Sequence, residues 1–137
     1  MCLAIYVASS EALPGIERSA VSPGVFLESE PEGSAVRAQF FLPNVYYVGS
    51  HLGCGCGFSR RAHTGEDKQR ADSDHGSLAA IVRTAVTRGA EIQLFACWEG
   101  MQDSSPTLVA SVSLDELEGE SFEFEELELL TVVETTD

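Results

Sequence analysis

The sequence predicts an α+β domain, in which a mixed or antiparallel β-sheet carries one main helix packed on a face. Short runs with the two-residue period of β-strands lie on both sides of one clear helical pattern, at residues 77–89. The length of 137 residues favours a single domain over residues 1–137. A chain of that size buries about two-thirds of its unfolded surface, which is enough for a core.

Strand candidates precede the helix. Cys2–Ala8 is apolar on both faces, as expected of a central strand. Val25–Glu28 is a second, shorter candidate. Val36–Phe41 and Val45–Ser50 flank a turn at residues 42–44, and this pattern predicts a hairpin.

Residues 59–76 contain no large apolar side chain and hold half of the basic residues of the chain. Such a segment buries too little apolar area to offset its ordering entropy. We therefore expect a mobile loop at 59–76. Loops of this length inside a domain are either functional lids or disordered segments.

The helix is predicted from a stripe of apolar residues with helical spacing, capped by Ser77 and ended by Gly89. The stripe consists of Leu78, Ile81, Val82, Ala85 and Val86. Strands are then expected at Glu91–Glu99, Thr107–Val112 and Phe122–Val133. Between the last two, Ser113 and Glu116 have the spacing of a capping box and predict a helix of one turn.

The charge of the chain excludes some classes of partner. A net charge of −14 and a pI near 4.4 argue against binding to nucleic acid or to an anionic membrane, because both would be repelled. No segment approaches the ~20 apolar residues that span a bilayer. With only four cysteines and no export signal, we expect a cytoplasmic protein with reduced thiols. The sequence identifies no small-molecule ligand and no oligomeric state.

The strongest chemical signal follows the strand at Val45–Ser50, where His51, Cys54 and Cys56 alternate with glycines. Thiolate and imidazole groups bind soft metals, and glycines allow a loop to curl around an ion. The pattern predicts a metal site, with zinc as the expected ion. Because a structural zinc site needs four ligands, we expect Cys97 to join from the strand at Glu91–Glu99. Cys97 lies on the face of that strand opposite Leu94, and small neighbours such as Ala4 and Ala8 are expected to leave open space beside the sheet there. Other possible donors are Cys2, His63 and His75.

Other interpretations of the same residues remain open. Cys54 and Cys56 fit small buried side chains in a glycine-rich turn, within a structural module that has no metal and no catalytic role. They also fit a thiol-redox pair, because a Cys-Gly-Cys disulfide is strained and reducible. Cys2 would be an N-terminal nucleophile if Met1 were removed. Residues 53–57 with Arg60 and Arg61 would suit an anion, and the acidic run over 115–137 suits a solvated face.

Three stretches together resemble a bacterial protein family that has no established activity. They are Met-Cys-Leu-Ala-Ile-Tyr-Val-Ala at residues 1–8, Val-Tyr-Tyr-Val-Gly-Ser-His-Leu-Gly-Cys-Gly-Cys-Gly-Phe at 45–58, and Leu-Phe-Ala-Cys-Trp-Glu-Gly at 94–100. The resemblance transfers no catalytic residue, so the question of an enzymatic activity stays open. All four cysteines lie in these stretches, which suggests that they gather in space.

Overall fold

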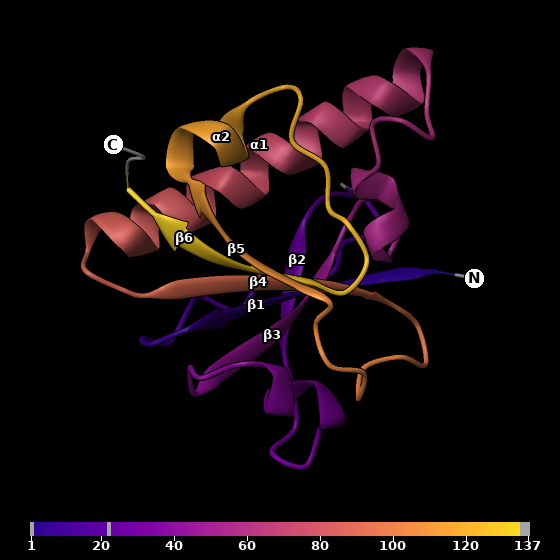
Figure 1. Cartoon of the computed structure of the whole chain (residues 1–137). Helices are drawn as coiled ribbons and strands as arrows, with labels where there is room; N and C mark the ends of the chain where they lie inside the picture. The colour runs from indigo at the N-terminus through magenta and orange to yellow at the C-terminus, as the bar shows by residue number, and fades with distance from the viewer. Residues whose placement is uncertain (1, 22, 135–137) are drawn as a thin grey trace.

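The predicted α+β class is confirmed by a computed structural model, which describes residues 2–21 and 23–134. A mixed β-sheet carries one long helix on a face (Figure 1). The strands are β1 (Leu3–Ser9), β2 (Phe26–Ser29), β3 (Asn44–Gly49), β4 (Ile92–Trp98), β5 (Leu108–Ser113) and β6 (Glu128–Val133). The α-helices are α1 (Gly65–Thr87) and α2 (Leu114–Glu118), and the 3₁₀ helices are η1 (Ala35–Gln39) and η2 (Gly55–Phe58).

The six strands form one sheet in the order β2-β3-β1-β4-β6-β5. All neighbouring strands are antiparallel except β5 and β6, which run parallel. The first strand, β1, lies between β3 and β4. Its position explains why both of its faces are apolar, because layers of side chains cover the sheet above and below it.

The two faces of the sheet have different covers (Figure 1). Helix α1 packs on one face, where Leu78 and Val82 join Ile5, Val7 and Leu94 in the larger core. The opposite face holds a smaller cluster that includes Tyr6, Phe95 and Cys97. Val36 of η1 and the adjacent Phe40 cover this second cluster, and the Phe40 ring lies edge-on to that of Phe95 at 6.2 Å.

The hairpin predicted over residues 36–50 is wrong. Its first arm is the 3₁₀ helix η1, and β3 pairs with β1 and β2 instead. The guanidinium of Arg37 holds this compact turn, because it donates hydrogen bonds to the carbonyls of Glu30, Pro31 and Pro43 at 2.5–2.9 Å. These bonds join residues on both sides of η1, which a two-residue pattern of apolar side chains does not reveal.

The loop predicted over residues 59–76 is wrong for residues 65–76, because α1 begins at Gly65 rather than at Ser77. Its first turns are mostly polar, and ion pairs one turn apart join Glu66 to Arg70 and Lys68 to Asp72. Ala71, Asp74 and His75 extend the buried stripe toward the N-terminus of the helix. Residues 59–64 lie outside helices and strands, and their mobility stays a prediction.

The C-terminal elements follow the prediction with one change. The Ser113 hydroxyl accepts a hydrogen bond from the Glu116 N–H at 3.1 Å and caps α2, as the capping-box spacing predicts. The last strand covers only Glu128–Val133, so it is shorter than the predicted Phe122–Val133. Phe122 and Phe124 lie before it in an irregular segment, and their rings pack around His75.

The stripe on α1 gives a stability prediction. Leu78 is 1% exposed, whereas Ile81 is only half-buried at the edge of the core. Leu78→Ala should therefore lower the free energy of unfolding by about 2–5 kcal/mol, because it removes buried methyl groups and leaves a cavity. Ile81→Ala should cost less than Leu78→Ala. Urea unfolding of both variants measures the difference, and an equal or reversed order would contradict the packing described for α1.

Candidate metal centre

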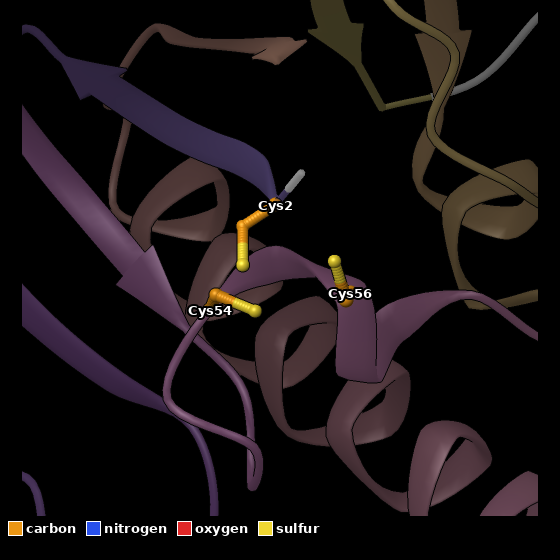
Figure 2. Close-up of side chains that lie close together, drawn as sticks. All are labelled: Cys2, Cys54 and Cys56. Atoms are coloured by element: carbon orange, nitrogen blue, oxygen red, sulfur yellow. The ribbon is translucent and has the colours of Figure 1, made fainter. Parts of the chain in front are cut away.

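Three thiols lie together at one end of the sheet. The sulfur atoms of Cys2, Cys54 and Cys56 are all within 4.8 Å of one another (Figure 2). Cys2 lies directly before β1, Cys54 is the N-cap residue of η2, and Cys56 lies within η2. Sulfurs bound to one tetrahedral zinc ion are about 3.8 Å apart at a Zn–S distance near 2.3 Å. Small side-chain rotations would therefore bring these three thiolates around one ion.

The glycines of this loop allow it to lie directly against β1. A Cβ atom on Gly55 would lie 2.6 Å from the carbonyl oxygen of Leu3 and 2.9 Å from Cγ1 of Ile5. A Cβ atom on Gly57 would lie 2.1 Å from the Ser50 hydroxyl. All three distances are shorter than real Cβ contacts, so a side chain at Gly55 would push the loop away from β1, and one at Gly57 would push it away from Ser50. Because Gly55 and Gly57 have no side chains, the loop can lie close enough to β1 for Cys54 and Cys56 to approach Cys2.

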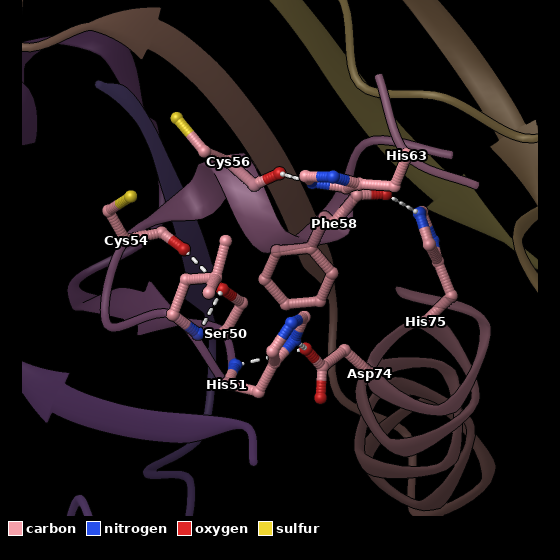
Figure 3. A network of polar contacts seen from close by, with 9 residues as sticks. Ser50, His51, Cys54, Cys56, Phe58, His63, Asp74 and His75 are labelled. Carbon is pink, nitrogen blue, oxygen red and sulfur yellow. Dashed lines mark hydrogen bonds and ion pairs between the residues drawn. The ribbon is translucent and has the colours of Figure 1, made fainter. Parts of the chain in front are cut away.

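Ser50 and His51 fix the start of the loop (Figure 3). The Ser50 hydroxyl donates to the Cys54 carbonyl at 2.5 Å, and it accepts from the Leu52 N–H at 3.1 Å. The carboxylate of Asp74 on α1 accepts the His51 N–H at 3.0 Å and lies 2.5 Å from its Nδ1. Both side chains of this His–Asp pair are 5% exposed. His51, predicted as a metal ligand, therefore joins the loop to α1 and is outside the thiol group.

The other two histidines support the same loop from its C-terminal side (Figure 3). Nε2 of His63 lies 3.1 Å from the Cys56 carbonyl oxygen. Nε2 of His75 lies 2.7 Å from the Phe58 carbonyl oxygen, and the ring is 2% exposed. Both histidines were considered as metal donors, and the structure places each on a backbone carbonyl. The three histidines thus position the loop around the thiols.

The environment of His75 makes folding pH-dependent. Burial lowers the pKa of this imidazole from its ordinary 6.5, and the nearby Arg60 guanidinium lowers it further. The ring is therefore neutral in the folded chain, with Nε2–H donating to Phe58. Since the unfolded chain binds the proton more readily, stability should fall as the pH drops below 6.5. The slope contributed by this group is at most about 1.4 kcal/mol per pH unit. Urea unfolding at a series of pH values should show that His75→Gln reduces the slope, and an unchanged slope would contradict a buried, neutral His75.

Cys97 is not part of the thiol group. It pairs with Ala4 across β1 and β4, is fully buried, and belongs to the cluster covered by η1. The strand pattern correctly places it on the face opposite Leu94, but that face is filled by Val36 and Phe40. Burial, and next the charge of Glu99, raises the pKa of the Cys97 thiol to about 11. Cys2 takes the third position that the sequence assigned to Cys97.

The three thiols differ in their hydrogen bonds. Burial, together with the neighbouring Cys2 and Cys56 sulfurs, raises the pKa of the Cys54 thiol to about 11. The sulfur of Cys56 instead accepts a hydrogen bond from the Leu3 N–H at 3.2 Å. A bound cation would neutralise the gathered thiolates and displace their protons. Metal binding at this site would therefore release protons and would strengthen as the pH rises.

Arg60 and Arg61 do not form an anion site with the glycine loop. The Arg60 side chain is 8% exposed, pairs with Asp72 at 2.7 Å and donates to the carbonyls of Gly119 and Phe122. Arg61 pairs with Glu125 at 2.9 Å. Both arginines connect the segment after η2 to the segment before β6. The sequence did not lead us to predict Asp72 and Asp74 as the partners of Arg60 and His51. A signal for the helix that carries them was present, because Ala71 and His75 continue the helical stripe that begins at Leu78.

Comparisons with protein-family models, with curated proteins and with solved structures found no match to this chain. The resemblance of three stretches to a bacterial family therefore stays a prediction. Within residues 2–21 and 23–134, none of the helices is long and apolar enough to cross a membrane. The function must be argued from the thiol group and its surroundings.

Proposed function

We propose that the chain binds a soft metal ion through the thiolates of Cys2, Cys54 and Cys56, with zinc as the first candidate. The observation that carries this proposal is the grouping of three ligand sulfurs within 4.8 Å, drawn from two separate parts of the chain. Thiolates prefer zinc, copper(I) and iron–sulfur clusters over magnesium or calcium. In the reducing cytoplasm that the cysteine content predicts, these thiols would stay available as ligands.

Three protein ligands suit a site that exchanges or activates something at the metal. Structural zinc sites are closed by four protein ligands, whereas catalytic zinc sites have three and leave one position open. Among the described residues, the group of possible ligands contains three sulfurs, and both His51 and Cys97 lie outside it. The proposed site therefore keeps a coordination position for a small molecule, and copper(I) bound by three thiolates is an alternative ion of the same class.

Metal titration of the reduced protein tests the proposal. Zinc should bind with a stoichiometry of one ion per chain, remain after dialysis, and protect Cys2, Cys54 and Cys56 from alkylation. Cadmium should give the ultraviolet absorption of thiolate–metal bonds and compete with zinc for the same site. Elemental analysis that finds no retained zinc, copper or iron, together with unchanged alkylation of all three thiols, would exclude the metal site.

A thiol-redox function is the second candidate, and the Leu3 N–H···Sγ contact of Cys56 favours it. Cys56 would attack a disulfide as the thiolate, and Cys54 or Cys2 would then resolve the mixed disulfide. The chain would lose two electrons and two protons to a partner disulfide such as oxidised glutathione. Equilibration with glutathione buffers distinguishes the candidates. A reversible disulfide among these three residues in metal-free protein supports redox chemistry, and persistent free thiols exclude it.

A further inference from the structure

A cleft of about 450 Å³ opens beside the thiol group. Cys56 belongs to both, because its sulfur lies in the thiol group and the residue also lines the cleft. The cleft separates η2 and the following segment from Trp98 of β4 and from the segment before β6. A small molecule in this cleft would therefore contact the proposed metal site at Cys56.

The walls of the cleft combine aromatic rings with an excess of negative charge. Leu3, Phe58, Phe124 and Trp98 supply apolar surface. The residues that line the cleft also include three carboxylates and one guanidinium, namely those of Glu123, Glu125, Glu126 and Arg61. The charges do not cancel, because Arg61 forms an ion pair with Glu125, which leaves the negative charges of Glu123 and Glu126. An anionic ligand would be repelled, and a cationic one attracted.

Glu126 and Trp98 provide the most suitable position for a positive charge. The indole Nε1–H of Trp98 donates to the Glu126 carboxylate, which holds the carboxylate beside the aromatic ring. A carboxylate at the edge of an indole attracts an ammonium group by its charge, and an ammonium group that also lies over the ring face gains cation–π attraction. Glu123 is engaged differently, since one of its oxygens accepts the backbone N–H groups of Arg60 and Arg61 at 2.7 and 3.0 Å. Its main effect is to shape the wall.

We propose that this cleft binds a small organic amine, with its ammonium group against the Glu126 carboxylate and the face of the Trp98 ring, and its apolar body against Phe58 and Phe124. The far end of the ligand reaches the Cys56 sulfur. The inference deepens the proposed function, because a donor atom at the far end of such a ligand would reach the open coordination position. Its physical basis is the charge and shape of the cleft, so it can be tested on metal-free protein.

Methanethiosulfonate reagents of opposite charge test the electrostatic part. The 2-aminoethyl reagent is cationic and the 2-sulfonatoethyl reagent is anionic; each transfers its thioalkyl group to a thiolate and releases methanesulfinate. Peptide mass spectrometry gives the labelling rate of Cys56 in reduced, metal-free protein, normalised to the rate of a free small thiol. The cationic reagent should be favoured by about tenfold. Glu126→Gln should reduce this preference by about threefold.

Glu17→Gln is the matched control, because it removes one exposed carboxylate that does not line the cleft. Glu17→Gln changes the net charge of the chain by the same amount as Glu126→Gln. It should leave the preference of Cys56 for the cationic reagent unchanged. Equal preferences in Glu126→Gln and Glu17→Gln would mean that only the overall charge acts, and this result would overturn the proposal.

Protection by an unreactive amine tests binding itself. Benzylammonium, at millimolar concentration, should slow the labelling of Cys56 in the wild-type protein, whereas benzyl alcohol of similar shape should not. Glu126→Gln should lose this protection. No protection by benzylammonium would refute the amine site while leaving the metal proposal intact. Conversely, protection by benzylammonium combined with no retained zinc in the metal titration would support the cleft and refute only the metal site.

Discussion

Replacing any one of Cys2, Cys54 or Cys56 by alanine should weaken zinc binding by about a hundredfold or more. Zinc held by four protein ligands gains about 10–16 kcal/mol, so one thiolate contributes roughly 3 kcal/mol, and each 1.4 kcal/mol changes affinity tenfold. Competition with a chromophoric chelator in reducing buffer measures the dissociation constants. The three variants should weaken binding to similar extents, because each removes one sulfur from the same group.

Cys97→Ala is the matched control, since it removes the same atom from a thiol outside the group. It should lower stability modestly through a small cavity in the second cluster, while zinc affinity stays within about threefold of the wild type. A hundredfold loss of affinity in Cys97→Ala would restore the ligand set predicted from the sequence. Unchanged affinity in Cys54→Ala and Cys56→Ala would instead exclude the thiol group as the metal site.

The predictable parts of this chain are those whose pattern is local. β1 was expected at the centre of a sheet because both of its faces are apolar, and the structure places it between β3 and β4. The C-terminal half of α1 was expected from its apolar stripe, and the cap of α2 from Ser113 and Glu116. Each of these signals involves residues within a few turns or one strand, so neighbours in sequence are enough to define it.

The N-terminal half of α1 was missed because its buried face is polar. Asp74 and His75 lie on that face only because partners from the glycine loop receive them, namely His51 and the Phe58 carbonyl. These partners are 23 and 17 residues away along the chain. A count of apolar residues therefore reports no core-facing side there, although the polar groups are buried and hydrogen-bonded.

The predicted ligand set differs from the thiol group for a related reason. Cys97 was expected to face open space beside the sheet, and its face was correct. The open space was inferred from the small neighbours Ala4 and Ala8, and this inference was wrong. Once residues 35–39 form η1, Val36 and Phe40 cover Cys97 and bury it. The thiol group then forms at the end of β1, where Cys2 meets the glycine loop.

Gly55→Ala should damage the contact of the loop with β1. The new Cβ would lie 2.6 Å from the backbone carbonyl oxygen of Leu3, in a central strand that cannot move away without breaking its pairing with β3 and β4. The loop must shift instead, so we expect a loss of about 1–3 kcal/mol in unfolding free energy. The shift would also lengthen the Leu3 N–H···Sγ contact of Cys56 and separate the sulfurs, lowering zinc affinity by about tenfold.

Gly15→Ala is the control for the alanine itself, because a Cβ at Gly15 meets no atom within 4 Å. It should change the unfolding free energy by less than about 0.5 kcal/mol and leave zinc affinity unchanged. Chemical denaturation and the chelator competition give both quantities for each variant. If Gly55→Ala were as stable as Gly15→Ala, the loop would not lie against Leu3 as described. If Gly55→Ala lost stability but kept its zinc affinity, the close approach of the loop to β1 would not be what assembles the three thiolates.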